Sequence, residues 1–367
     1  MLLNYPQPNV HSNSSQKNNG TNMPNLMWIH CLRVCAMLMV VVLHSAAPTL
    51  YRFKGPSDTD WMTGNFYDSF VRVCVPLFFM ISGFLLLDKT ESTSSFINKR
   101  LKKIVIPTLF WTLIYLTWKI LYEKQKLDLG HSLLTALISP SYYHLWFVYA
   151  TIGLYLAIPI LRKFVTNATN SNIIYFLSIW FFCVAILPLI EKTLGTKAKY
   201  DIGIFTGYAG YLILGLFLGR FTYKSFHAII SVATIIAGLL ITALGTYFLT
   251  LEKGSFVDKF YGYLSPAIIL SAAAWLILFK YIFQDKGLSI NTHIEKSITS
   301  LSSLSFGIYL VHALYLTALK SGAFGFKVSA LSGNPAIWIP ITAFLVFFLS
   351  YTTVWILSKI PFLRRTV

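Results

Sequence analysis

The chain is built of long apolar runs separated by short polar segments. About 20 apolar residues are enough for a helix to cross the hydrocarbon core of a bilayer. Runs near or above this length span 27–48, 66–87, 105–122, 144–161, 173–191, 204–219, 226–250, 261–283, 301–319 and 336–358. Because a lipid-exposed backbone must satisfy its hydrogen bonds internally, the pattern predicts an all-α, polytopic membrane protein of about ten transmembrane helices.

The first 25 residues differ from the rest of the chain. They are rich in Asn and Ser, which predicts a disordered polar N-terminal tail over 1–25. They lack the basic and short apolar regions of a cleavable signal peptide, so we expect the first run to be an uncleaved anchor. The loops are too short to fold alone, so 26–367 is expected to form a single transmembrane domain.

Lys and Arg placement predicts the orientation. An even number of spans puts both termini on one side, and the dense basic cluster at 99–103 falls on that same side. Cytoplasmic loops are enriched in Lys and Arg, so we expect both termini to be cytoplasmic.

Composition narrows the class of partner. The 367 residues are 56% hydrophobic and 12% charged with a net charge of +17, whereas about a quarter of a soluble domain is charged. A soluble nucleic-acid binder could share the charge but not the apolar content, so we expect membrane lipids and no nucleic acid as partners. All four cysteines lie in apolar runs, which is typical of buried packing residues. No His or carboxylate joins Cys31 and Cys35 at a metal-ligand spacing, and we expect no metal.

Two ionisable residues share one face of the first span. Arg33 and His44 are eleven residues apart, only about 20° past three full helical turns and roughly 16 Å along the axis. They can therefore line one channel from the inner side to deep in the membrane. For either residue alone, another interpretation stays open, in which Arg33 reaches the headgroups and His44 packs in the core.

Other spans add polar groups at a similar depth. Asp68 and Arg72 are spaced i,i+4, which predicts an ion pair on one helix. Arg72 and His312 should lie in the outer half of the membrane, as His44 does, and Tyr309 shares a face with His312. Charges at this depth are costly and usually functional.

His144 marks the outer mouth of the fourth span, where Trp146 could be a simple interfacial aromatic residue. Polar groups from separate helices thus share one layer, which predicts a functional site. Neutral imidazole can act as general base on a hydroxyl, and a nearby Arg or second His can stabilise an oxyanion.

The basic cluster suggests a phosphorylated ligand. Arg100, Lys102 and Lys103 could hold the phosphates of a donor, although an ordinary positive-inside loop has the same composition. The sequence contains no Walker loop, GxSxG elbow or HExxH motif, so ATP-driven transport, serine hydrolysis and zinc proteolysis lack support.

At these residues the sequence resembles the membrane-bound acyltransferase-3 family of bacterial O-acyltransferases. Arg33 and His44 match an arginine and a histidine with ten residues between them in that family's first helix. Further matching segments are RVCVPLFFMISGFLLL (72–87), INKRLKKIVIP (97–107), HLWFVYATIGLYLAIP (144–159) and SFGIYLVH (305–312). The resemblance runs from about residue 27 to the C-terminus.

The resemblance implies a ten-helix protein of the bacterial inner membrane that transfers an acyl group from cytoplasmic acyl-CoA to a carbohydrate hydroxyl on the far side. Similarity to shorter members that acetylate enterobacterial common antigen or lipopolysaccharide O-antigen implies acetyl-CoA as donor. The implied roles are His44 as catalytic histidine, Arg33 at the donor or the site, Arg72 and His312 in support, and Arg100 and Lys103 at the phosphates, with Lys102 expected beside them from the charge of the cluster. On the acceptor side we expect Asp68, His144, Trp146 and Tyr309.

This sequence departs from the family at two positions. His30 stands where an acidic residue is common, and Arg100-Leu-Lys-Lys103 replaces an Arg-x-x-Arg pattern. Lysine keeps the charge but not the bidentate recognition of phosphate. Longer members also carry an SGNH-type hydrolase domain as a second transferase, so without one this chain is expected to complete the transfer itself.

A second function uses the same residues. A proton-coupled transporter or lipid-linked-sugar flippase could employ the intramembrane His and Arg residues as a relay. Broken helices or an inverted repeat would favour that function, and the sequence shows no internal symmetry.

Overall fold

The computed structural model describes residues 26–197, 207–284 and 291–367, and these contain no β-strand. The helices are α1 (Met27–Leu50), α2 (Thr59–Val71), α3 (Cys74–Leu86), α4 (Thr93–Leu121), α5 (Leu129–Thr135), α6 (Trp146–Asn167), α7 (Asn170–Phe181), α8 (Leu187–Leu194), α9 (Ala209–Gly219), α10 (Ser225–Lys253), α11 (Pro266–Gln284), α12 (Thr292–Ser321) and α13 (Pro335–Lys359). A π-helical turn, Phe182–Ile186, joins α7 to α8, and short 3-10 turns follow at Lys259–Tyr261 and Leu363–Thr366.

The described ranges hold nine helices long and apolar enough to cross a membrane, which confirms the all-α polytopic architecture. The remaining predicted span, 204–219, lies partly outside the described residues. Its described helix α9 is only 11 residues long, about 16 Å at 1.5 Å per residue, against a hydrocarbon core of about 30 Å. The predicted tail 1–25 lies outside the described residues.

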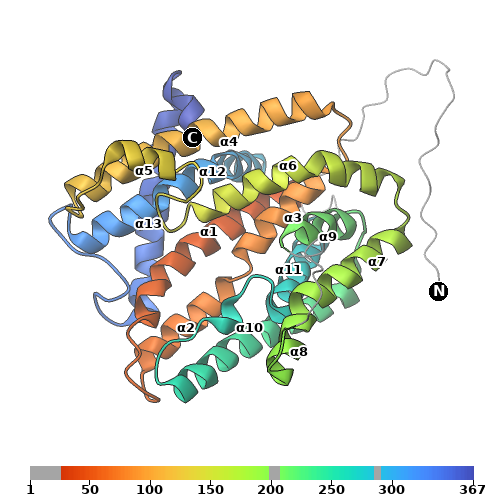
Figure 1. Ribbon diagram of the computed structural model, residues 1–367, viewed down its shortest axis with the longest axis horizontal. Helices are drawn as coiled ribbons and strands as arrows, with labels where there is room; N and C mark the ends of the chain where they lie inside the picture. The colour runs from red at the N-terminus through yellow and green to blue at the C-terminus, as the bar shows by residue number, and fades with distance from the viewer. Residues whose placement is uncertain (1–25, 198–206, 285–290) are drawn as a thin grey trace.

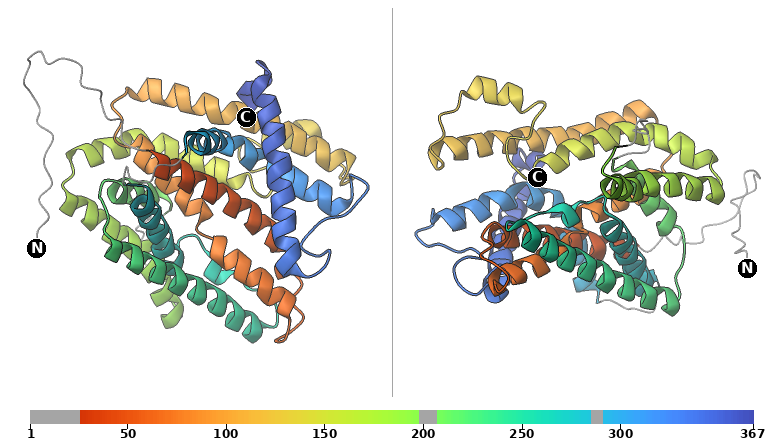
Figure 2. Two further views of the ribbon diagram at one scale, coloured as in Figure 1. Left: turned by 180° about the vertical axis from the view of Figure 1, so that it is seen from behind. Right: turned by 60° about the horizontal axis from the view of Figure 1, so that its bottom comes forward.

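Helix α1 lies at the centre of the bundle. It packs against α2, α3, α11, α12 and α13, and Figure 1 shows it running between α6 on one side and α2 and α3 on the other. In Figure 2, α4, α5 and α6 lie together along one side, while α13 crosses α1 at a steep angle. A residue on α1 can therefore contact several other helices at once.

The second predicted span is interrupted where α2 ends and α3 begins. Pro76 has no N–H, so it cannot bond to the carbonyl of Arg72 four residues earlier. The regular ladder resumes one residue later, where the N–H of Leu77 donates to the carbonyl of Val73 at 3.0 Å. The interruption puts Arg72 at a bend inside the membrane rather than in a continuous helix.

Helices α3 and α9 cross at backbone contact. A Cβ added to Gly83 would lie 1.9 Å from the carbonyl oxygen of Leu212, and one added to Gly215 would lie 2.1 Å from that of Met80. Only glycine fits at both positions. Small residues allow such close crossings in membranes, where van der Waals packing drives helix association.

The basic segment 97–107 is helical, not the inner loop that the sequence suggested. Ser92 caps α4, its hydroxyl accepting from the N–H of Ser95 at 3.3 Å, and Phe96 anchors the first turn in the core. An N-cap of this kind satisfies an otherwise orphan N–H at the start of a helix. The basic residues therefore lie on defined faces of α4.

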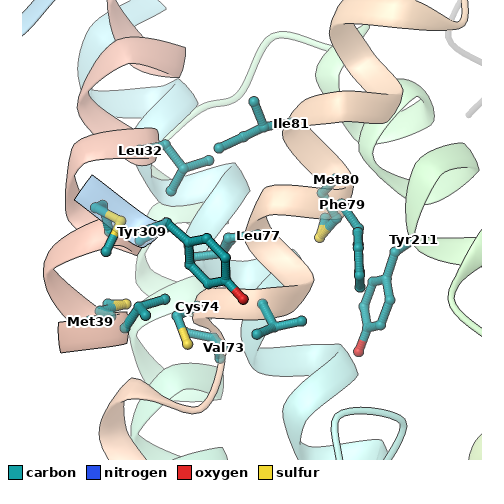
Figure 3. Packing of buried hydrophobic residues seen from close by; sticks show 14 of the residues in the cluster. Leu32, Met39, Val73, Cys74, Leu77, Phe79, Met80, Ile81, Tyr211 and Tyr309 are labelled. Carbon is teal, nitrogen blue, oxygen red and sulfur yellow. The ribbon is translucent and has the colours of Figure 1, made fainter. Parts of the chain in front are cut away.

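The largest core cluster surrounds α1 and α3. Figure 3 shows the ring of Tyr309, from α12, among buried side chains of these two helices: Leu32, Met39, Cys74 and Leu77. This apolar packing fixes the position of α12 beside α1 and so sets the place of the polar residues described next.

Candidate functional site

Three histidines from separate parts of the chain meet in the bundle. The ring centre of His312, on α12, lies 5.2 Å from that of His44 on α1 and 5.1 Å from that of His144, just before α6. His312 and His144 are buried, and His44 is partly exposed. The sequence placed these residues in one layer, and the structure brings them into contact.

The hydrogen bond that His312 makes fixes its tautomer. Its Nδ1 lies 2.5 Å from the backbone carbonyl of Tyr309, and a carbonyl oxygen can only accept. In the neutral ring, Nδ1 therefore carries the proton and Nε2 presents a lone pair. That Nε2 is buried and has no hydrogen-bond partner among the described residues, so the neutral ring is an acceptor. Stabilising an oxyanion, the role expected for His312, would require the protonated ring.

Tyr309 connects two of the histidines. Its hydroxyl donates to the backbone carbonyl of His144, and its own carbonyl holds His312. Both ring nitrogens of His144 are buried without a partner in the described part of the chain. The backbone of Leu310 is close enough to interact with this ring, and His144 also lines the cavity described next.

A small cavity adjoins His44. Its walls include His44, His144, Trp146, Tyr263 and Tyr309, and its volume is about 20 Å³. That is room for about one water molecule. Trp146 stacks on Tyr263, with ring centres 5.6 Å apart, so here it lines the cavity in addition to any interfacial role.

Arg72 lies near this cavity and contacts Tyr263, one of the residues that line it. It forms the predicted ion pair with Asp68, which is fully buried on α2. Its guanidinium lies 4.2 Å from the centre of the Tyr261 ring and 5.9 Å from that of Tyr263, and Tyr263 lines the cavity. Cation–π contacts of this kind hold a partly buried guanidinium in place.

Arg33 lies at the opposite end of α1 from His44. That end also holds the end of α3, since the rings of Trp28 and Phe84 are 5.0 Å apart. Arg33 lies within electrostatic range of Tyr155 on α6, and no carboxylate pairs with it in the described ranges. An intramembrane arginine without an acidic partner is free to pair with an anionic ligand.

The residues of the basic cluster differ in how far they are buried. Arg100 is partly buried, with its guanidinium 5.9 Å from the Phe96 ring centre and a buried Nε that lacks a partner in the described part of the chain. Lys102 and Lys103 are exposed. Arg100 lies at the same end of the bundle as Arg33, since the Phe96 ring that it contacts is 6.2 Å from the ring of Tyr155.

Arg162 has a structural role that its sequence context did not indicate. This buried residue donates to the backbone carbonyl of Leu86 at 2.9 Å and to Glu91 at 3.1 Å, and it stacks on Phe96 at 4.4 Å. Its hydrogen bond lowers the pKa of Glu91 below the usual range, helped by the charges of Arg100 and Lys99. Arg162 thus ties α6 to the ends of α3 and α4. Its position at the end of an apolar run was the only available signal.

Although three histidines meet, residues 26–197, 207–284 and 291–367 contain no group of His, Cys, Asp or Glu arranged to hold a metal ion. The four cysteines are unpaired. The ionisable side chains brought together here are imidazoles, a guanidinium, a carboxylate and phenols.

Fold and site together define a multi-pass membrane protein with a cluster of histidines inside its helical bundle. The model of one family, described as an acyltransferase domain, matches residues 26–358. The chain belongs to this acyltransferase-3 family and is a membrane acyltransferase. Comparisons with curated proteins and with solved structures give no match.

Proposed function

We propose that this acyltransferase moves an acetyl group from acetyl-CoA to a hydroxyl of a surface polysaccharide, such as lipopolysaccharide O-antigen, or of its lipid-linked precursor. His44 is the general base. The observation that carries the proposal is the contact of partly exposed His44 with buried His312 at the edge of a cavity. A base must be reachable by its substrate, and His44 is the only one of the three that is not fully buried.

In the proposed reaction, His44 takes the proton of the sugar hydroxyl while the hydroxyl oxygen attacks the carbonyl carbon of the thioester. A C–O bond forms, and the carbonyl oxygen carries the negative charge of the tetrahedral intermediate. When the intermediate collapses, the C–S bond breaks and the thiol of CoA leaves with the proton that His44 held. General base catalysis of this kind contributes about 10²- to 10⁴-fold to a rate.

Arg72 is the group that supports charge in the proposed site. Its guanidinium, held by Asp68 and by the ring of Tyr261, is a fixed positive charge near the cavity. A preorganised charge of this kind stabilises an oxyanion without reorganising during the reaction. Tyr309, Trp146 and His144 then shape the acceptor side.

The donor is proposed to enter from the end of the bundle that holds Arg33. Arg33 and Arg100 bind the phosphates, and Lys102 and Lys103 attract the anionic donor from the surface. The pantetheine arm follows the face of α1 that carries both Arg33 and His44. In this arrangement the donor end and both termini are cytoplasmic, the membrane is the bacterial inner membrane, and the acceptor approaches from the outer half.

The test is transfer of radiolabelled acetyl groups from acetyl-CoA in isolated membranes. His44→Ala should lower transfer at least about 100-fold at equal expression. His131→Ala is the matched control, because His131 is exposed on α5 away from the cluster, and it should leave transfer unchanged. Near-normal transfer by His44→Ala would show that His44 is not the base.

A further inference from the structure

An exposed aromatic ring lies directly beside the proposed base. The ring of Tyr143 is 5.1 Å from that of His44, in edge-to-face geometry, and 5.6 Å from that of His144. Tyr143 is 52% exposed, and its hydroxyl has no hydrogen-bond partner among the described residues. His44 is in ring contact with Tyr143 and His312, and of these two rings only Tyr143 is open to a ligand.

The backbone on both sides of Tyr143 is firmly held. Tyr142 is buried, stacks on Tyr115 with ring centres 4.5 Å apart, and shares a hydrogen bond of 2.8 Å with Thr317. On the other side, the carbonyl of His144 accepts from Tyr309. An exposed side chain between two anchored neighbours loses little further conformational entropy when a ligand packs on it.

The size of the cavity places the acceptor outside it. A volume of about 20 Å³ admits about one water molecule and excludes a sugar ring. A sugar hydroxyl that reaches His44 must therefore belong to a ring that lies outside the cavity. Tyr143 does not line the cavity, but its exposed ring contacts the ring of His44, which does.

We infer that Tyr143 is the stacking platform for the acceptor sugar and presents its hydroxyl to His44. This inference rests on the proposed function. A pyranose carries hydroxyls on its edge and C–H groups on its faces, and the C–H groups pack against the negative face of an aromatic ring. A sugar seated in this way directs its edge hydroxyls toward the neighbouring imidazole. Tyr143 is a positioning residue, since it acts through the placement of the sugar.

The alternative role for an exposed tyrosine in this protein is an interfacial anchor. Tyr122 supplies the comparison. It is 57% exposed at the end of α4 and stacks on Trp118 with ring centres 4.1 Å apart. Within the described part of the chain it makes no ring contact with a histidine of the cluster. An anchoring role would make Tyr143 and Tyr122 equivalent on substitution, whereas a stacking role would not.

The experiment measures initial rates with purified protein, acetyl-CoA and surface polysaccharide extracted from cells that lack this protein. Tyr143→Leu should raise the KM for polysaccharide about tenfold and leave the KM for acetyl-CoA unchanged. Tyr143→Phe keeps the ring and should stay within about twofold of wild type. Tyr122→Leu should match wild type, and the thermal midpoints of all variants report whether the fold is intact.

Each outcome decides between roles. An unchanged polysaccharide KM in Tyr143→Leu, or a fall in kcat alone, overturns the stacking role while His44 keeps its assignment. Equal effects of Tyr143→Leu and Tyr122→Leu would assign both tyrosines to membrane anchoring. This result would also overturn the stacking role of Tyr143. Failure of the proposed function is seen separately, as full activity of His44→Ala with wild-type Tyr143.

Discussion

The tautomer of His312 leads to a prediction that distinguishes two roles for this side chain. The neutral ring would accept a hydrogen bond through Nε2, whereas the protonated ring would donate one to an oxyanion. A neutral ring with Nδ1–H on the carbonyl of Tyr309 can only accept through Nε2. Glutamine can reproduce both features, since its amide N–H₂ donates and its carbonyl accepts. We therefore expect His312→Gln to keep about a tenth of the wild-type kcat, and His312→Leu to lose about 100-fold. Steady-state acetyl transfer at varied acetyl-CoA concentration measures kcat for both variants.

Equal and complete loss in the two variants would mean that the protonated ring is needed, and His312 would then act on the oxyanion. The donor KM is the internal control, because His312 is fully buried at the end of the bundle away from Arg33. It should not change in either variant.

At the scale of helices, the crossing of α3 and α9 predicts that one added methyl group destabilises the fold at this crossing but not on an exposed helix face. In Gly83→Ala the new Cβ would lie 1.9 Å from the backbone oxygen of Leu212, and a backbone atom cannot move aside as a side-chain tip can. We expect a loss of about 1–3 kcal/mol in the free energy of unfolding, measured by thermal unfolding in detergent.

Gly153→Ala is the matched control for this substitution. Gly153 lies on an exposed face of α6, and a Cβ there meets nothing within 4 Å. Because alanine favours the helix over glycine, this variant should be unchanged or more stable by up to about 1 kcal/mol. A stable Gly83→Ala would mean that α3 and α9 do not cross at backbone contact.

The helices were predictable from the sequence where a single physical property determines their position. Apolar runs predicted the spans because length and hydropathy determine membrane crossing. The position of Arg33 and His44 on one face followed from helical periodicity alone. The break at Arg72 was missed because one missing N–H at Pro76 leaves the hydropathy of the run unchanged. The start of α4 was missed because lysines resemble a loop by composition, whereas the cap at Ser92 and the buried Phe96 decide it.

At the scale of the whole molecule, the sequence predicted that the histidines of the cluster lie at a similar depth in the membrane, but not that they are in contact. Depth along a span comes from residue number, but contact between His144 and His312 depends on which helices are neighbours, and one sequence carries no such information. Tyr143 was missed for the same reason. Beside His144, it reads as one of several interfacial aromatics until its ring is seen against His44.

The division of the molecule into two functional ends predicts unequal roles within the basic cluster. Coenzyme A that binds only the folded state raises its stability, by about 2.7 kcal/mol at 100 times the dissociation constant. Arg100 faces the bundle and has a buried Nε that lacks a partner in the described part of the chain, so Arg100→Ala should weaken CoA about tenfold, the loss of one charged hydrogen bond. Lys102→Ala and Lys103→Ala should each weaken it less than about threefold, because exposed charges are screened.

Titration of the thermal midpoint with CoA measures all three variants, and the midpoints without ligand report any loss of stability from the substitutions alone. Arg33→Ala should behave like Arg100→Ala, since both arginines lie at the proposed donor end. His44→Ala should bind CoA nearly as well as wild type, because the phosphates lie roughly 16 Å away along α1. If Lys103→Ala had the largest effect, the donor would be held at the exposed face of α4, and the route along the face of α1 would have to be abandoned.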